Sequence, residues 1–258
     1  MHSARDYSTV TEVPGIRVTA EAMAMAYSRY AFAAEQCADR DVLEVACGAG
    51  PGLGCIGARA RRLVAADFTA DLLHRARQHY QHRVPLVRLD AHALPFGSGS
   101  FDVILLFEAV YYLADVNRFF EECHRVLRRP GLLMLCTVNC QWRDFNPSPF
   151  STRYLSAPAL RSALAESGFG VDLFGGFPVA DDRPASAAVS RVKRAAIRSG
   201  LMPRTMKGKE LLKRLFLGPL VAVPNEFEPG ATIYDRPVPI NGSGEARFKV
   251  IYAVARPR

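Results

Sequence analysis

The feature that most constrains the fold of this chain is an apolar stretch that breaks abruptly into glycines at residues 42–54. The stretch is apolar up to Cys47 apart from Glu44, and glycine then stands at every second position from Gly48. Glycine tolerates positive φ and lets a ligand approach the backbone, and a following helix offers unpaired N–H groups. The pattern predicts a strand, a nucleotide-binding turn and a helix, with a plain connecting turn as the other interpretation. Leu53 stands where a dinucleotide fingerprint requires its third glycine, which disfavours an NAD-dependent oxidoreductase.

Two more carboxylates follow predicted strands. Residues 63–66 form a predicted second strand that ends at Asp67, a short carboxylate that can accept hydrogen bonds from both hydroxyls of a ribose. Residues 85–89 form a third that ends at Asp90, where a carboxylate and the N–H of Ala91 can bind an adenine edge. One acid after a strand is common as a turn former or helix cap. Three strand ends in series, each carrying a group that one nucleoside needs, indicate a single binding site.

Helical and strand patterns alternate along the chain. Helices are expected over residues 53–62, 69–77, 115–127 and 157–168, and further strands over residues 101–107, 132–138, 171–174 and 247–255. Arg128 and Arg129 suit the C-terminal dipole of the third helix, and Pro130 then stops it. This order predicts a doubly wound, Rossmann-like α/β fold with a mainly parallel sheet. The last strand, which alternates polar and apolar residues at its start, is expected to return antiparallel.

A long insertion precedes that last strand. Residues 178–245 are too many for a plain connection, so we expect a substrate-recognition lid there, assisted by residues 140–157. The core is then formed by residues 1–177 and 246–258. The insertion is strongly basic. Ten lysines and arginines lie between positions 183 and 214, with Glu210 as the single acid among them, and the whole chain has a formal net charge of +8.

Four further segments, residues 25–34, 90–96, 100–103 and 108–113, complete a recognisable pattern. With the glycine turn they resemble the class I S-adenosylmethionine-dependent methyltransferases, in their ubiquinone/menaquinone-biosynthesis-like branch. Residues 144–149 and 206–209 are also similar to a subgroup encoded with bacterial surface-polysaccharide genes, which bears on the acceptor and not on the reaction. The more usual Asp-x-Gly-Cys-Gly is Glu-Val-Ala-Cys-Gly here, a departure that keeps the carboxylate and a small third residue.

The resemblance implies S-adenosylmethionine as cofactor, S-adenosylhomocysteine as product and no metal. It implies that Glu44 orients the methionine amine directly or through water, that Asp67 holds the ribose and that Asp90 reads the adenine. Arg29 would pair with the methionine carboxylate, with a solvated helix charge as the alternative. The residues expected to contact the cofactor are Arg29, Tyr30, Glu44, Ala46, Gly48, Gly50, Asp67, Phe68, Asp90, Ala91 and Phe107.

Methyl transfer from a sulfonium is an in-line displacement, in which placing the acceptor correctly supplies on the order of 7 to 11 kcal/mol. A hydroxyl acceptor also needs a base. Glu108, at the end of the fourth predicted strand, is the first candidate catalytic residue because desolvation there should raise its pKa. Tyr112 is the second, and Tyr111, His92 and Asn139 are further alternatives. A positioning or water-binding role for Glu108 stays open.

Composition bears on the compartment. The longest apolar stretches have strand length and residues 1–16 lack the apolar centre of a signal peptide, so we expect a cytoplasmic protein. The six cysteines include no C-x-x-C pair and lie mostly within apolar elements, which favours reduced core thiols over a metal site.

The charge of the insertion points to an anionic partner, with a solvated basic face as the alternative. Phosphate on an activated or lipid-linked sugar comes first and an anionic membrane surface, with peripheral contact, second. Nucleic acid is unlikely, because the basic residues are not interleaved with aromatic ones. We therefore predict methylation of a small or saccharide acceptor, at a hydroxyl of an anionic or lipid-linked sugar. The alternatives are N- or C-methylation and a non-catalytic S-adenosylmethionine- or nucleotide-binding domain.

Overall fold

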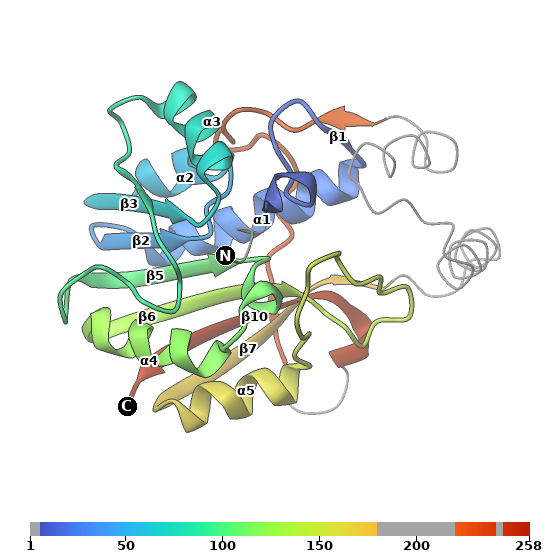
Figure 1. Cartoon of the computed structure of the whole chain (residues 1–258). Coiled ribbons are helices and arrows are strands. Elements are labelled where there is room, and N and C mark those ends of the chain that lie inside the picture. The colour runs from blue at the N-terminus through green and yellow to red at the C-terminus, as the bar shows by residue number, and fades with distance from the viewer. Residues whose placement is uncertain (1–5, 180–219, 241–244) are drawn as a thin grey trace.

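The computed structural model describes residues 6–179, 220–240 and 245–258. A sheet of order β4-β3-β2-β5-β6-β10-β7-β9 runs through these residues (Figure 1). Its strands are β2 (Asp41–Val45), β3 (Arg62–Asp67), β4 (Leu86–Arg88), β5 (Phe101–Phe107), β6 (Leu127–Val138), β7 (Phe169–Pro178), β9 (Val238–Pro239) and β10 (Phe248–Pro257). The helices are α1 (Ala20–Gln36), α2 (Leu53–Gly57), α3 (Ala70–Tyr80), α4 (Val116–Val126) and α5 (Ala157–Glu166), with the short 3-10 turns η1 (Tyr7–Thr9), η2 (Val110–Tyr112) and η3 (Glu245–Arg247).

Strand directions confirm the predicted fold class. Strands β2 to β6 pair with one another in parallel. The last strand, β10, lies between β6 and β7 and runs antiparallel to both, so that Tyr252 is opposite Cys136 on one side and Phe174 on the other. The sequence thus predicted both the parallel direction of most strands and the antiparallel direction of the last one.

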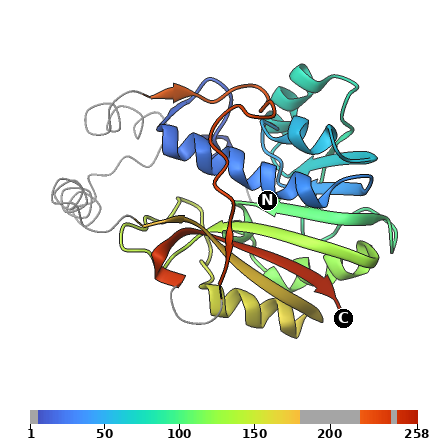
Figure 2. The same ribbon diagram turned by 180° about the vertical axis from the view of Figure 1, so that it is seen from behind.

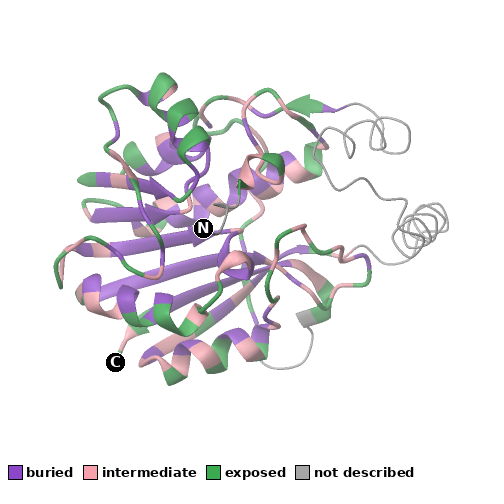
Figure 3. Ribbon diagram, in the orientation of Figure 1, coloured by how far each residue is buried: buried purple, intermediate pink, exposed green. Residues whose placement is uncertain are grey.

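The sheet is buried on both faces, as expected of parallel strands between helices. Helices α1, α2 and α3 cover one face, and α4 and α5 cover the other (Figures 1 and 2). Because side chains alternate along a strand, Val42 packs into the cluster on the α1 face while Leu43 packs into the cluster on the α4 face. Figure 3 shows the resulting buried layer along the central strands.

The four helices predicted above each end one to five residues from the predicted position, and tertiary contacts explain two of these differences. Helix α2 ends at Gly57 and not at residue 62, since the Arg61 N–H donates to Arg40 O at 3.0 Å and draws the chain into β3. Helix α4 ends at Val126, and β6 begins at the next residue. Arg128 therefore lies near the start of β6, at the amino ends of the parallel strands, where it binds two aspartates. It does not lie at a helix terminus.

Part of the predicted insertion packs on the core. Residues 220–240, here called the strap, cross the α1 face of the molecule in orange (Figure 2). The strap contains β8 (Val221–Ala222), which pairs with β1 (Arg17–Val18), and ends at β9 on the edge of the main sheet. The basic residues between 183 and 214 lie outside the described residues, so the lid stays a prediction.

Over the described residues, no helix combines the length and apolar character needed to cross a bilayer. Five cysteines are buried free thiols, and Cys140 is half-buried and also free. Burial raises the pKa of each of these thiols.

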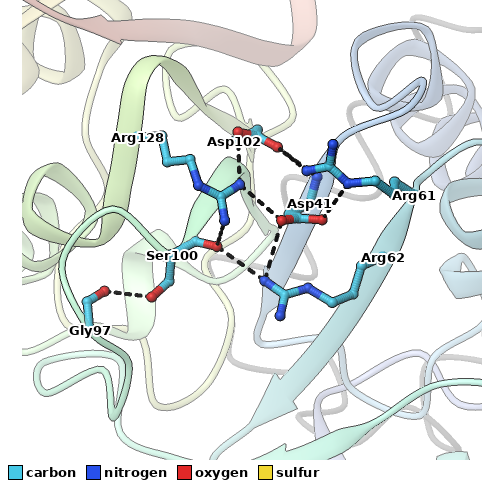
Figure 4. Close-up of polar contacts among 7 residues, drawn as sticks. All are labelled: Asp41, Arg61, Arg62, Gly97, Ser100, Asp102 and Arg128. Atoms are coloured by element: carbon cyan, nitrogen blue, oxygen red, sulfur yellow. Dashed lines mark hydrogen bonds and ion pairs between the residues drawn. The ribbon is translucent and has the colours of Figure 1, made fainter.

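An ion-pair cluster closes the amino end of the sheet (Figure 4). Asp41 Oδ1 accepts from Arg61 Nε at 3.0 Å, and Asp41 Oδ2 accepts from Arg128 Nη1 at 2.9 Å. The same Arg128 nitrogen lies 3.0 Å from Asp102 Oδ1. The Arg61 hydrogen bond and, against the effect of burial, that of Arg128 lower the pKa of Asp41 to about 2. The cluster joins the first residues of β2, β5 and β6 at the end of the sheet remote from the glycine turn.

We predict that this cluster makes the fold acid-sensitive. Asp41 has a folded pKa of about 2, against about 3.9 when unfolded, so its stabilisation is complete above the unfolded value and is lost as pH falls through the folded one. Urea unfolding between pH 5 and pH 2 should show a smaller loss of unfolding free energy for Asp41→Asn than for the parent. Asp71→Asn, at an exposed position on α3, should follow the parent. Equal losses for the parent and Asp41→Asn would contradict the prediction.

Candidate functional site

A cavity of about 510 Å³ lies at the carboxyl ends of β2, β3, β4 and β5. The carboxyl ends of neighbouring parallel strands share one edge of a sheet, which is where open α/β folds bind ligands. The predicted site residues that line it are Arg29, Tyr30, Ala46, Gly48, Asp67, Phe68, Asp90, Ala91, Phe107, Glu108 and Tyr112. Glu44 and Gly50 are not among the described residues that line it.

The glycine turn adopts the backbone that its sequence predicts. Gly48 has φ +59° and Gly50 has φ +80°, both in the left-handed region that favours glycine. Ala46 also has φ +59°, which is unusual for a residue with a side chain. The hydroxyl of Tyr80, at the end of α3, holds the turn from outside by donating to Gly50 O at 2.7 Å and accepting from the Gly54 N–H at 3.2 Å.

Asp67 is fixed by backbone donors on two sides. Its Oδ2 accepts from the Gly48 N–H at 2.8 Å, and its Oδ1 accepts from the Thr69 N–H at 2.7 Å. Burial raises the pKa of Asp67, and these hydrogen bonds partly oppose that effect. Phe68 follows on the cavity wall with 39% of its surface exposed. A rigid carboxylate beside a partly exposed ring suits the ribose and adenine of a nucleoside.

Asp90 forms a compact pair with His92. Asp90 Oδ1 accepts from the His92 N–H at 2.9 Å and lies 2.6 Å from His92 Nδ1. The other ring nitrogen, Nε2, accepts from the Asp115 N–H at 3.2 Å, so Nδ1 is the atom that carries the proton. Burial would raise the pKa of Asp90, but the bonds from His92 outweigh it and lower the pKa. With both nitrogens engaged, His92 serves this carboxylate and is not a free base.

Glu44 is the most buried of the predicted carboxylates, with 1% of its surface exposed. Its Oε1 accepts from the Tyr30 hydroxyl at 2.9 Å, whereas its Oε2 has no hydrogen-bond partner among the described residues. Burial raises the pKa of Glu44 to about 7. The bond joins β2 to α1, and the cofactor contact predicted for Glu44 stays a prediction.

Arg29 brings a positive charge to the cavity wall. Its Nη2 lies 3.9 Å from Glu12 Oε2, and its Nε is buried without a hydrogen-bond partner among the described residues. Burial works to lower the pKa of Arg29, but the negative groups around it, Glu12 and Glu108 included, raise it overall. The guanidinium is therefore charged and retains a free donor.

Glu108 directly follows β5 and has a backbone conformation that a glutamate rarely adopts. Its φ is +51°, a left-handed backbone that costs of the order of 1–3 kcal/mol when a side chain is present. Its Oε2 accepts from the Tyr111 hydroxyl at 3.1 Å and from the Val138 N–H at 3.3 Å. Burial raises the pKa of Glu108, against the opposing charge of Arg29. The cavity thus presents a carboxylate whose proton affinity is increased.

The other candidate bases are placed less favourably. Tyr112 lines the cavity, its hydroxyl lies 2.6 Å from Ser148 Oγ, and burial raises the pKa of that hydroxyl to about 12. The Tyr111 hydroxyl is already bonded to Glu108, and burial raises its pKa further. Asn139 donates through Nδ2 to Phe248 O at 2.8 Å and is absent from the described cavity wall.

Sequence reasoning missed four residues that reach the cavity from distant segments, Tyr7, Thr11, Glu12 and Lys249, whereas Trp142 lies within the segment 140–157 that was expected near the acceptor. Tyr7 lies on η1, and the centroid of its ring lies 6.5 Å from that of Phe68 and 5.0 Å from that of Tyr112. It therefore contacts both a predicted cofactor residue and a candidate base. No local pattern marks residues 6–13 as part of a site, because their role arises only from folding back over the strand ends.

The comparisons with known proteins decide what kind of domain carries this cavity. Residues 43–135 match a family described as "Methyltransferase domain". Residues 43–135 are thus similar to methyltransferase domains. A probable S-adenosylmethionine-dependent methyltransferase of Mycobacterium tuberculosis is 39% identical over 144 residues, 54% of this chain and 52% of that protein. The chain spans about half the length of the curated relatives it matches.

Solved structures support the fold. A structure titled as an S-adenosylmethionine-dependent methyltransferase, possible histamine N-methyltransferase, from Thermotoga maritima has a TM-score of 0.56 and 12% identity, covering 92% of each chain. The [4+2]-cyclase SpnF has a TM-score of 0.60 and 16% identity, covering 96% of this chain and 88% of its own. At such identities the likeness shows the fold alone. The family match and the relatives together indicate S-adenosylmethionine as the cofactor of the region that they match.

The residues present fit that cofactor. Asp67 and Asp90 supply fixed acceptors at the ends of β3 and β4, and Gly48 lets a ligand approach the backbone. The free buried donor on Arg29 suits a carboxylate, and the free buried oxygen of Glu44 suits an ammonium group. The cavity wall therefore carries groups that complement the ribose, the adenine and the carboxylate of the cofactor, and Glu44 is buried two residues before Ala46, which lies on that wall.

We predict that Asp67→Ala weakens binding of S-adenosylhomocysteine by about 10- to 100-fold, as expected when hydrogen bonds to a charged group are lost. Isothermal titration calorimetry would measure this, with far-UV circular dichroism to establish folding. Asp71→Ala removes an equal charge from an exposed position on the same side of the sheet and should bind like the parent. A Kd for Asp67→Ala within twofold of the parent would exclude the role of this carboxylate.

Proposed function

We propose that this protein transfers a methyl group from S-adenosylmethionine to a hydroxyl oxygen of a small or saccharide acceptor. The observation that carries the proposal is the position of Glu108, a carboxylate with a raised pKa in the cavity shared by Asp67 and Asp90. The match of residues 43–135 to a methyltransferase domain supports the reaction class.

Glu108 supports an oxygen acceptor because a hydroxyl must lose its proton when it is methylated. S-adenosylmethionine, when bound, supplies an electrophilic methyl group on a sulfonium. The chain's part is to orient the acceptor hydroxyl toward that group and to receive its proton on a Glu108 oxygen. The Tyr111 hydroxyl, bonded to Oε2, fixes the carboxylate, and Arg29 provides a compensating positive charge nearby. Such a base is typically worth about 10²- to 10⁴-fold in rate.

An anionic or lipid-linked sugar is the acceptor class that we propose. Its support is the excess of basic residues between positions 183 and 214 and the likeness of residues 144–149 and 206–209 to enzymes encoded with polysaccharide genes. Trp142 lies on the cavity wall and Ser148 bonds to Tyr112, so residues 140–157 are near enough to contribute to acceptor binding. Contact with an anionic membrane through the basic residues belongs to the same proposal.

Turnover separates this function from the alternatives. Formation of S-adenosylhomocysteine should be measured with sugar phosphates, lipid-linked saccharides, amines and neutral phenols as acceptors. Turnover confined to amines would favour N-methylation. Binding of S-adenosylmethionine with no turnover in cell extract would favour a non-catalytic domain or a reaction of another kind, as the name of the cyclase SpnF illustrates for this fold.

We predict that Glu108→Gln lowers kcat by about 10²- to 10⁴-fold while the Kd for S-adenosylhomocysteine stays within about threefold of the parent. A base acts only when deprotonated, and the pKa of Glu108 is raised, so the parent's kcat should rise with pH through that raised pKa and then level off. Tyr112→Phe is the matched comparison. If Tyr112→Phe abolishes turnover and Glu108→Gln does not, the tyrosine is the base.

A further inference from the structure

The strap touches the glycine turn through the backbone of Phe227. The Phe227 N–H donates to Pro51 O at 2.7 Å, and Phe227 O accepts from Cys55 Sγ at 3.3 Å. Pro51 lies within the turn and Cys55 lies on α2, directly after it. Phe227 therefore bonds to the glycine turn at Pro51 and to the first helical turn after it at Cys55. No described residue of the strap lines the cavity, so this contact is made from behind the binding surface.

The side chain of Phe227 continues the contact into the core. Only 1% of Phe227 is exposed, and its ring centroid lies 5.9 Å from that of Tyr27 and 6.2 Å from that of Tyr30. Tyr30 in turn covers Gly52 so closely that a Cβ there would lie 2.1 Å from the ring. The same ring carries the hydroxyl that binds Glu44. Removing the Phe227 ring would leave Tyr30 free to shift away from the turn.

Glu226 makes a second, polar contact beside the first. Its Oε2 lies 2.7 Å from His79 Nε2 and 2.7 Å from Arg83 Nη2, both near the end of α3. Its Oε1 fills the space over Gly54, where a Cβ would lie 1.9 Å away. Tyr80, which lies between His79 and Arg83 in the sequence, bonds to Gly50 and Gly54. The strap and the end of α3 therefore contact each other and the same glycine turn.

We propose that the strap positions the cofactor-binding turn from behind, with Phe227 and Glu226 as positioning residues that hold the turn and Tyr30 in their binding geometry. The inference rests on the proposed function, since it concerns the same cofactor. It assigns to part of the predicted insertion a role in cofactor affinity, where the sequence suggested only acceptor recognition. Neither residue touches the reacting atoms.

The test is the affinity of the full chain for S-adenosylhomocysteine, measured by calorimetry well below the unfolding temperature. Phe227→Ala should weaken binding by about tenfold or more, because displacing binding groups by about 1 Å is enough for losses of that size. Glu226→Gln, which keeps the shape and loses the ion pairs, should weaken it by about threefold. If Phe227→Ala does not fold, Phe227→Leu carries the test with a smaller loss.

A double-mutant cycle with Tyr30→Phe distinguishes positioning from mere stabilisation. If Phe227 acts through Tyr30, the combined loss of affinity should be smaller than the product of the two single losses. Arg236→Ala is the control, because Arg236 anchors another part of the strap by binding Glu35 at 2.8 Å. It should lower the unfolding temperature without changing the Kd. Affinity within twofold of the parent for folded Phe227 variants would overturn the inference, whereas a parent that does not bind S-adenosylhomocysteine would overturn the proposed function.

Discussion

A carboxylate buried in the central strand of the sheet is the constraint on which the geometry of the site depends. Glu44 stands between apolar neighbours on β2, and an unpaired charge there would be costly. Two features limit that cost, the raised pKa and the hydroxyl of Tyr30. Tyr30 can reach Glu44 only if α1 lies close to the sheet and Gly52 has no side chain. The packing of α1, the bare Cα of Gly52 and the strap's aromatic contact together hold Tyr30 where it can bond to Glu44.

The carboxylates on the cavity wall are of two kinds, which differ in their hydrogen-bond partners and in their burial. Asp67 is held by two backbone N–H groups and Asp90 by His92, so both are acceptors in fixed positions. Glu108 has weaker partners and a left-handed backbone, and burial raises its pKa. Holding a glutamate in that strained conformation is worthwhile only if its position matters, which agrees with a role in the reaction. The same cavity therefore holds two carboxylates in fixed positions and one whose proton affinity is raised, which is the combination that the proposed reaction needs.

The sequence predicted those parts of the site that follow from local pattern. Glycine spacing, strand length and the acid after each strand are local properties, and parallel pairing then brings Asp67 and Asp90 to one edge. Contacts between distant segments leave no such trace. Tyr7 reaches the cavity by folding over the strand ends, and Glu226 meets His79 from a segment 147 residues away. Arg128 was expected to serve a helix end, yet it bridges Asp41 and Asp102, partners that only the assembled sheet provides.

The placement of β10 affects the order in which the sheet can be completed. β6 and β7 are synthesised before β10, the strand that lies between them in the sheet. Because chains begin to fold from the residues made first, β6 and β7 are present before the strand that joins them. Until β10 is synthesised, β7 and α5 have no hydrogen-bonded ladder to the parallel strands, and two strand edges stay open. The docking of β10 is therefore the step that joins β7 and α5 to the parallel part of the sheet.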